Sequence, residues 1–148
     1  MKKIVFLVLI AAMWLAACGP ARITTGILDI KNPWARPAAE GANGAVYFVI
    51  ENGTSQDDVL LSGRTDIASV VELHESEIDG DHMSMHHQDE VVLPAGEAVE
   101  FSPGGLHIML VGLTRQLKAG ETFDITLMFK QAGEKTITVS VKDDVNDD

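Results

Sequence analysis

Short runs of alternating apolar and polar residues, separated by turn residues, most strongly constrain how this chain can fold. In residues 122–129 every second side chain is Phe, Ile, Leu or Phe, which is typical of a strand with one buried face. Similar runs recur about every eight to twelve residues, and no segment shows a sustained helical period. Because each sheet must bury one face against another, the pattern predicts an all-β chain folded as a single-domain antiparallel β-sandwich.

We expect strands at residues 27–30, 45–51, 59–62, 70–75, 91–93, 98–101, 106–113, 122–129 and 135–141. The run 45–51 is almost continuously apolar, which predicts a buried central strand. Pro33 and Pro37 exclude a central strand after the first run. Trp34, between them, is expected to pack at an edge of the sandwich or, as the alternative, to lie near a metal site. Met128 falls on the polar face of its strand and is expected at the surface.

The first residues have the composition of an export signal. Lys2 and Lys3 precede an apolar stretch, residues 4–15, which is too short for a comfortable membrane span. Residues 15–18, LAAC, resemble a bacterial lipobox, which implies cleavage before Cys18 and attachment of a lipid to its sulfur. The alternative is an ordinary secretory signal followed by an incidental cysteine.

These features predict a lipoprotein anchored at the outer face of a bacterial cell membrane, either periplasmic or on the cell surface. The expected organisation is a lipoprotein signal peptide at residues 1–17, a lipidated tether at 18–26, one β-sandwich domain at 27–142 and a disordered acidic tail at 143–148.

Charge and cysteine content exclude several classes of function. The formal net charge of −11 becomes −13 once Lys2 and Lys3 are removed with the signal, so we expect no binding to nucleic acid. A need for solubility explains this acidity at least as well as a role in attracting metal ions. Cys18 is the only cysteine, so no disulfide can form within the chain, and once lipidated it offers no thiolate to a metal.

Two imidazoles and two thioethers in the stretch 74–109 suggest a metal site: His74, Met85, His107 and Met109. Side chains two apart in a strand share a face, so His107 and Met109 point the same way, roughly 7 Å apart. Thioether sulfur is a soft, neutral donor that suits Cu(I) better than zinc or iron. A lone Met or His is more often a packing residue, and the prediction therefore depends on the four occurring together.

A hairpin would bring the first two donors close to each other. Asp79-Gly80 is a strong hairpin signal, because a type I′ turn needs positive φ at both central residues. With these two residues as the loop, His74 lies directly opposite Met85, and their Cβ atoms are about 5 Å apart. A longer loop would shift this register and leaves open whether Met83 or Met85 is the ligand.

The same hairpin carries three of the five histidines. His82, His86 and His87, together with Met83, form a candidate auxiliary site for Cu(II), because nitrogen ligands suit the oxidised ion. The alternative is a solvent-exposed hairpin without a second metal.

The spacing of the four donors, His-x10-Met-x21-His-x-Met, is similar to the signature of the periplasmic copper chaperone PCu(A)C family. The surrounding sequence also resembles this family at VELHE (71–75), LPAG (93–96), PGGLHIML (103–110), LKAGE (117–121) and LMF (127–129). The resemblance covers about residues 27–142 and implies a cupredoxin-like β-sandwich that holds Cu(I). It also implies delivery of copper toward the copper A centre of cytochrome c oxidase, with subunit II or another copper chaperone as the acceptor.

The sequence does not indicate an enzyme. It contains no Gly-x-Ser-x-Gly elbow, no phosphate-binding Gly loop, no Rossmann fingerprint and no His-Glu-x-x-His motif. A blue-copper electron carrier needs a cysteine ligand, which the mature domain lacks. The alternative from a different class is a lipid-anchored β-sandwich that binds another protein and has no obligatory metal.

Overall fold

The computed structural model describes residues 23–80 and 82–143. The expected signal peptide, the lipidated Cys18 and residues 144–148 of the acidic tail lie outside the described residues. Within them, no helix is long and apolar enough to cross a membrane.

Residues 23–26, expected to belong to the tether, are hydrogen-bonded to the domain. The backbone N–H of Ile23 donates to the carbonyl of Gly96, and that of Gly26 donates to the carbonyl of Gly53, both at 2.8 Å. The last residues of the expected tether are therefore held against the domain.

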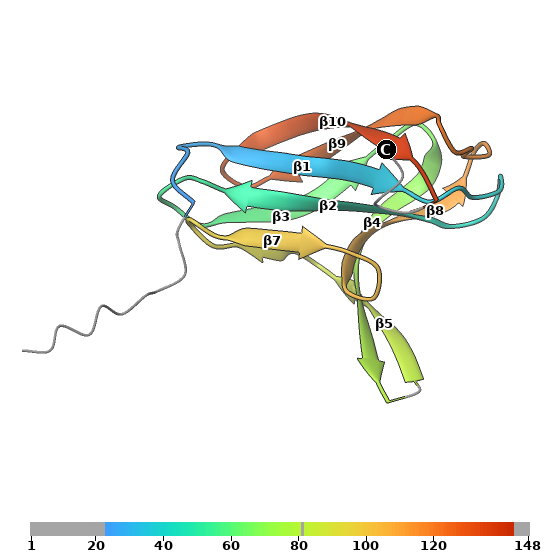
Figure 1. Cartoon of the computed structure of the whole chain (residues 1–148), viewed down its shortest axis with the longest axis horizontal. Helices are drawn as coiled ribbons and strands as arrows, with labels where there is room; N and C mark the ends of the chain where they lie inside the picture. Colours follow the sequence, from blue (N-terminus) through green and yellow to red (C-terminus); the bar gives the residue numbers. More distant parts are fainter. Residues whose placement is uncertain (1–22, 81, 144–148) are drawn as a thin grey trace, which may run out of the picture.

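The regular structure in the described residues is entirely β-strand (Figure 1). The strands are β1 (Leu28–Ala35), β2 (Gly44–Asn52), β3 (Asp58–Arg64), β4 (Ala68–Asp79), β5 (His82–Gln88), β6 (Val91–Leu93), β7 (Ala98–Phe101), β8 (Leu106–Leu113), β9 (Thr122–Phe129) and β10 (Gly133–Val141). The predicted all-β class is confirmed, and the predicted bounds of β8 and β9 match those observed.

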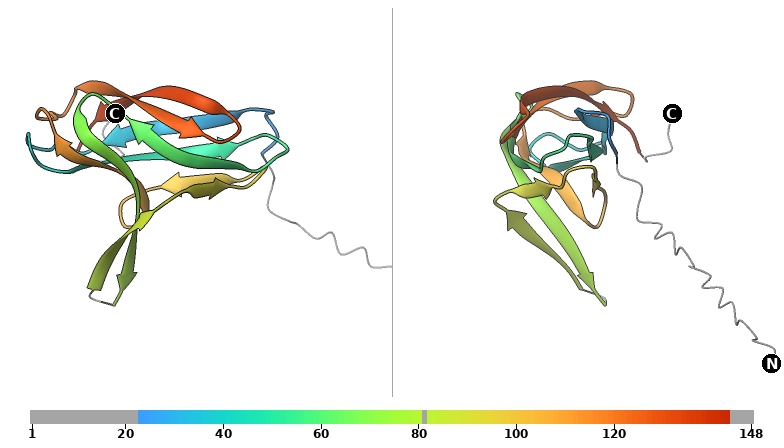
Figure 2. Two further views of the ribbon diagram at one scale, coloured as in Figure 1. Left: turned by 180° about the vertical axis from the view of Figure 1, so that it is seen from behind. Right: turned by 90° about the vertical axis from the view of Figure 1, so that its left-hand side faces the viewer.

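The strands follow one hydrogen-bonded order that curls into a sandwich (Figures 1 and 2). The order is β5-β4-β8-β2-β1-β10-β9-β3-β6, and β7 pairs with β2. All of these pairs are antiparallel except β1 with β10. The curl brings β3 close to β4, where a Cβ on Gly63 would lie 3.0 Å from Cγ1 of Val71. A glycine at this position therefore lets the two strands approach.

Side chains from strands throughout this order share one hydrophobic core. In β2 the fully or almost fully buried residues are Val46, Phe48 and Ile50, which confirms the predicted central strand. In β9 the alternating residues Phe123, Ile125, Leu127 and Phe129 are all buried. Met128, on the other face of β9, is 37% exposed, as the sequence predicts.

β1 extends beyond its predicted end. The prediction stopped this strand before Pro33, but β1 continues past the proline and lies between β2 and β10 in the interior of the sheet. The ladder register shifts between Lys31 and Trp34, and Asn32 has a φ of +50°. Such a bulge accommodates Pro33, because a residue within it need not donate to the ladder. Trp34 is therefore only 5% exposed and lies within the sheet rather than at its edge.

The hairpin between β4 and β5 forms where Asp79-Gly80 predicts it, but its loop is placed differently. Asp79 pairs with His82, so Asp79 belongs to the strand and the loop begins at Gly80. Gly80 has a φ of +61°, which suits the first loop position of a two-residue hairpin.

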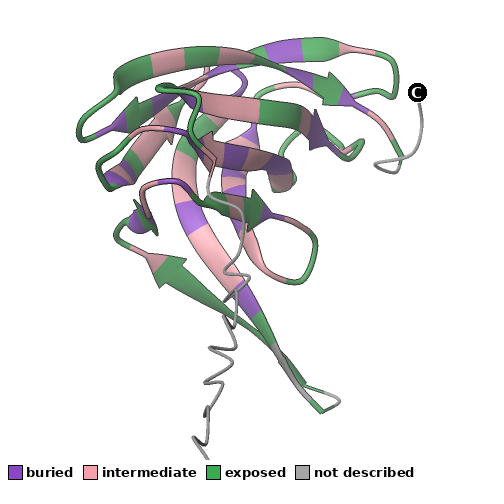
Figure 3. Ribbon diagram, turned by 60° about the vertical axis from the view of Figure 1, so that its left-hand side comes forward, coloured by how far each residue is buried: buried purple, intermediate pink, exposed green. Residues whose placement is uncertain are grey.

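The predicted pairing of His74 with Met85 is consequently wrong. His74 lies opposite His87, and Met85 lies opposite Ser76. Because the register differs by two residues, which is the side-chain period of a strand, each side chain stays on its predicted face. The hairpin projects from the sandwich, and β5 is exposed along most of its length (Figures 1 and 3).

Candidate metal site

Three adjacent strands place a row of imidazoles on one face of the sheet. His107 of β8 lies directly opposite His74 of β4, which in turn lies opposite His87 of β5. Directly opposed residues in an antiparallel pair share a face. The ring centroids of His74 and His107 are 5.9 Å apart, and those of His74 and His87 are 5.6 Å apart.

The two thioethers of the predicted site approach this row from two strands. Met109 is two residues along β8 from His107 and pairs with Glu72 of β4. Met85 is two residues along β5 from His87 and is 48% exposed. All four predicted donors therefore lie on the same face of β8, β4 and β5.

A cavity of about 420 Å³ lies over this face. Its wall includes Met83, Met85, His107 and Met109, and also Arg36, Pro37, Ala38, Asn43, Gly44, Ala45, Tyr47, Ser76, Pro103 and Gly104. Residues of the hairpin and of β8 thus line one cavity, although they pair with different residues along β4. His74 is not part of the wall and lies beside the cavity, next to His107.

His107 is oriented for binding through one nitrogen. The side chain is only 4% exposed, and its Nδ1 is 3.0 Å from the carbonyl oxygen of Gly105. Because a carbonyl only accepts hydrogen bonds, Nδ1 carries the proton, and the lone pair of the neutral ring is on Nε2. A backbone carbonyl that fixes the tautomer in this way is the usual partner of a metal-binding histidine.

His74 is oriented in the same manner but through the other nitrogen. Its Nε2 is 2.8 Å from Oε2 of Glu72, so the carboxylate accepts a hydrogen bond from Nε2–H. Nδ1 of His74 is buried and has no hydrogen-bond partner among the described residues. Leaving a buried polar atom unpaired costs about 1–3 kcal/mol, and a bound metal ion would satisfy this lone pair.

Of the residues around these ligands, the sequence suggests only Trp34, and only as an alternative. Tyr47 of β2 lies beside His107, with ring centroids 6.4 Å apart, and Trp34 stacks at a tilt on Tyr47 at 4.8 Å. The guanidinium of Arg36 lies 5.9 Å from the Trp34 ring. The Tyr47 ring therefore lies between Trp34 and His107. This position agrees better with the alternative prediction, a place near the metal site, than with a place at an edge of the sandwich. No local pattern predicts these neighbours, because they depend on the pairing of β1, β2 and β8.

Burial of Tyr47 raises the pKa of its phenol above the ordinary value of 10.0, and the positive charge of Arg36 opposes this only in part. The phenol is therefore neutral near pH 7 and adds no charge to the cavity.

The four residues of the predicted auxiliary site do not come together. Alternation along β5 places Met83 and His87 on the face of the main site and places His82 and His86 on the other face. Nε2 of His86 contacts the hydroxyl of Ser84 at 3.2 Å.

Among residues 23–80 and 82–143, no group of three His, Cys, Asp or Glu side chains could hold a metal ion.

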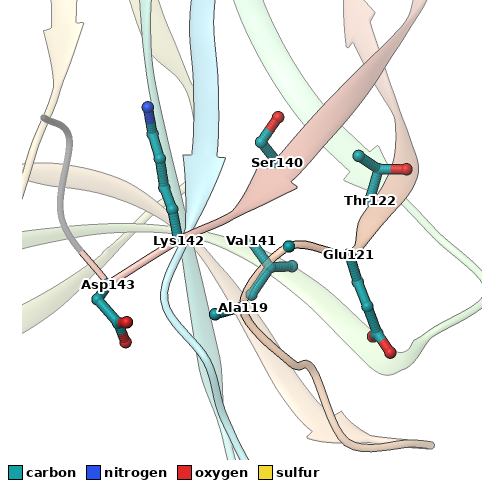
Figure 4. Close-up of a pocket in the computed structure, with 8 residues that line it drawn as sticks. Ala119, Glu121, Thr122, Ser140, Val141, Lys142 and Asp143 are labelled. Atoms are coloured by element: carbon teal, nitrogen blue, oxygen red, sulfur yellow. The ribbon is translucent and has the colours of Figure 1, made fainter. Parts of the chain in front are cut away.

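A larger hollow, of about 540 Å³, lies where β9 begins and β10 ends, and its wall contains no imidazole or thioether (Figure 4). Its wall is formed by Ala119, Gly120, Glu121, Thr122, Ser140, Val141, Lys142 and Asp143. Glu121 is already occupied: it accepts hydrogen bonds from the Lys118 backbone N–H and from Arg115, and these contacts lower its pKa.

The fold and the donor set define a class of protein: a β-sandwich that gathers imidazoles and thioethers on one face of the sheet, around a cavity lined by His107, Met83, Met85 and Met109. Solved structures of PCuAC and Cu(I)-bound proteins share this fold. A copper-bound PCuAC domain from PmoF2 superposes with a TM-score of 0.66 at 28% identity, covering 78% of this chain and 92% of that one. The Cu(I) form of DR1885 from Deinococcus radiodurans gives a TM-score of 0.63 at 27% identity, covering 81% and 83%.

Sequence comparison then gives the family. Residues 28–141 match the LpqE-like family of candidate lipoproteins, and this chain belongs to that family. A candidate lipoprotein of Leifsonia xyli subsp. xyli (strain CTCB07), Lxx21020, is 29% identical over 125 residues, covering 84% of this chain and 74% of the relative. The uncharacterized protein RP573 of Rickettsia prowazekii (strain Madrid E) is 32% identical over 117 residues, and the match spans 76% of this chain and 65% of RP573. The solved structures support the resemblance to PCu(A)C proteins seen in the sequence.

Proposed function

We propose that this protein is an exported, lipid-anchored copper chaperone that binds Cu(I) through His74, Met85, His107 and Met109. The observation that carries the proposal is the convergence of Met85, His107 and Met109 on one cavity, with His74, whose Nδ1 is unpaired, next to His107. Copper-bound domains of the same fold support the choice of metal.

The chemistry of the donors favours the reduced ion. Thioethers and imidazoles are neutral and need no deprotonation, and thioether sulfur prefers Cu(I) to Zn(II). Thioethers also cannot be lost to disulfides outside the cytoplasm, although oxidation to the sulfoxide would abolish binding.

The uneven burial of the donors provides a route for release. His107 is almost completely buried, whereas Met85 is 48% exposed on a projecting hairpin. A partner that offers thiolates can displace Met85 first and the buried imidazole last, one ligand at a time. The copper A centre of cytochrome c oxidase, reached through its subunit II or through another copper chaperone, is the acceptor that the resemblance implies. A lipid on Cys18 would hold the domain at the outer face of the membrane.

The test is anaerobic titration of the mature chain with Cu(I) in competition with a chromophoric chelator. We expect one tightly bound Cu(I) per chain and much weaker binding of Zn(II). Replacement of Met85 and Met109 together by Ala should lower the Cu(I) affinity by more than the roughly 10–100-fold that loss of one outer-shell partner costs, since two ligands are removed outright. Met128→Ala, which removes an exposed methionine of β9, is the matched control and should bind as the parent does.

Two results would contradict this assignment. One is a parent chain that binds no Cu(I) in competition with the chelator, which would favour a lipid-anchored interaction module without an obligatory metal. The other is an unchanged Cu(I) affinity in the double variant, which would place the copper elsewhere.

A further inference from the structure

The cavity wall contains a donor that the four-residue signature leaves out. Met83 is on the same face of β5 as Met85, two residues nearer the tip of the hairpin. Met83 lines the same hollow as Met85, His107 and Met109. It is also 66% exposed, more than Met85 at 48%. Three thioethers and one imidazole thus line the wall.

His74 lies next to the cavity but is not part of its wall. Its Nε2–H donates a hydrogen bond to the carboxylate of Glu72. Its free nitrogen is buried. A largely covered imidazole next to His107 and an exposed thioether in the wall therefore accompany Met85, His107 and Met109.

Both donors are neutral, so an ion can exchange one for the other without a change in charge. Methionine has three rotatable side-chain bonds and adapts readily to a moving partner. The imidazole is held in place by Glu72 and by packing between His107 and His87.

We infer that Met83 is a fifth copper ligand, which shares one coordination position with His74. In the closed arrangement Cu(I) is bound by His74, Met85, His107 and Met109. In the open arrangement the bond to His74 breaks, a bond to the Met83 sulfur forms, and copper remains Cu(I). The open arrangement presents the ion at the exposed side of the hairpin, where an acceptor can reach it.

This inference rests on the proposed function, and a double-mutant cycle tests it on the mature chain. Met83→Leu removes the sulfur and keeps the volume, and His74→Gln removes the imidazole. If the two donors substitute for each other, each single variant lowers Cu(I) affinity modestly. The double variant then loses more than the product of the two single losses, by a factor of at least about three. Met128→Leu is the control for removal of an exposed methionine and should leave the affinity unchanged.

A second measurement does not depend on any variant folding. In the parent chain labelled at the methionine methyl carbons, addition of Cu(I) should shift the NMR signals of Met83, Met85 and Met109 and leave that of Met128 in place. An unmoved Met83 signal overturns the inference, and so does a double variant whose loss equals the product of the single losses. If the parent chain takes up no Cu(I), the proposed function itself fails. If it takes up Cu(I) and only Met83 is silent, the proposed function stands and the fifth ligand is wrong.

Discussion

The hydrogen bond between Glu72 and His74 offers a sharp test of the site, because Glu72 would touch no metal itself. Oε2 of Glu72 lies 2.8 Å from Nε2 of His74 and keeps the ring proton on Nε2. The lone pair on Nδ1 is then available to copper. Glu72→Gln keeps the size of the side chain but replaces the carboxylate with an amide, which can also donate. The amide is a weaker acceptor and no longer selects one tautomer of the ring.

The size of the effect follows from the position of Glu72. Loss of a group that orients a metal ligand typically lowers metal affinity by about 10–100-fold. The Glu72 side chain is 35% exposed, so water screens part of its interaction, and we expect the lower end, about tenfold or 1.4 kcal/mol. The free energy of unfolding of the metal-free protein should change by less than about 1 kcal/mol, since the hydrogen bond is partly exposed.

The assay is Cu(I) titration with chelator competition, paired with urea unfolding of the metal-free chain. Glu75→Gln is the matched control: Glu75 is on the same strand but on the other face, where it accepts a hydrogen bond from Gln88. A Glu72→Gln variant with the parent affinity would refute the assignment of His74 Nδ1 as a ligand. An equal loss in Glu75→Gln would show that general charge, and not the orientation of His74, is responsible.

Three further predictions concern the sheet around the site. Tyr47 is the only tyrosine, so its titration can be followed by ultraviolet absorbance. Because burial raises its pKa, the midpoint of the titration should lie above 10.0. The contribution of Tyr47 to the free energy of unfolding should be lost as the pH rises through this raised pKa. A midpoint at or below 10.0 would contradict this burial. The buried carboxylate of Asp58 accepts hydrogen bonds from the backbone N–H groups of Val59, Gln131 and Ala132 at 2.7–2.8 Å. Asp58→Ala should therefore lower the free energy of unfolding by about 3 kcal/mol or more. Urea unfolding measures this loss, with Asp89→Ala, a change at an exposed carboxylate, as the control. Gly63→Ala should cost about 1–3 kcal/mol, because the new Cβ would lie 3.0 Å from Val71 and 3.3 Å from Leu127; a melting temperature equal to that of the parent would show that β3 and β4 can separate at little cost.

The sequence by itself determined what depends on short-range spacing. Alternation gave the bounds of β8 and β9, and the spacing of two between His107 and Met109 placed them on one face. The hairpin at Asp79-Gly80 also follows from local turn chemistry. These predictions hold because the side-chain period of a strand is two residues whatever the strand pairs with.

Only the tertiary structure decided which strands are neighbours and in what register. The loop at Gly80 changed the partner of His74 from Met85 to His87, yet a register difference of two kept both donors on the same face. The place of β8 between β4 and β2 brought Tyr47 beside His107 and set Met109 opposite Glu72, and a bulge carried β1 past Pro33. Strand order and register depend on how distant segments bury their faces together, and no local period records that information.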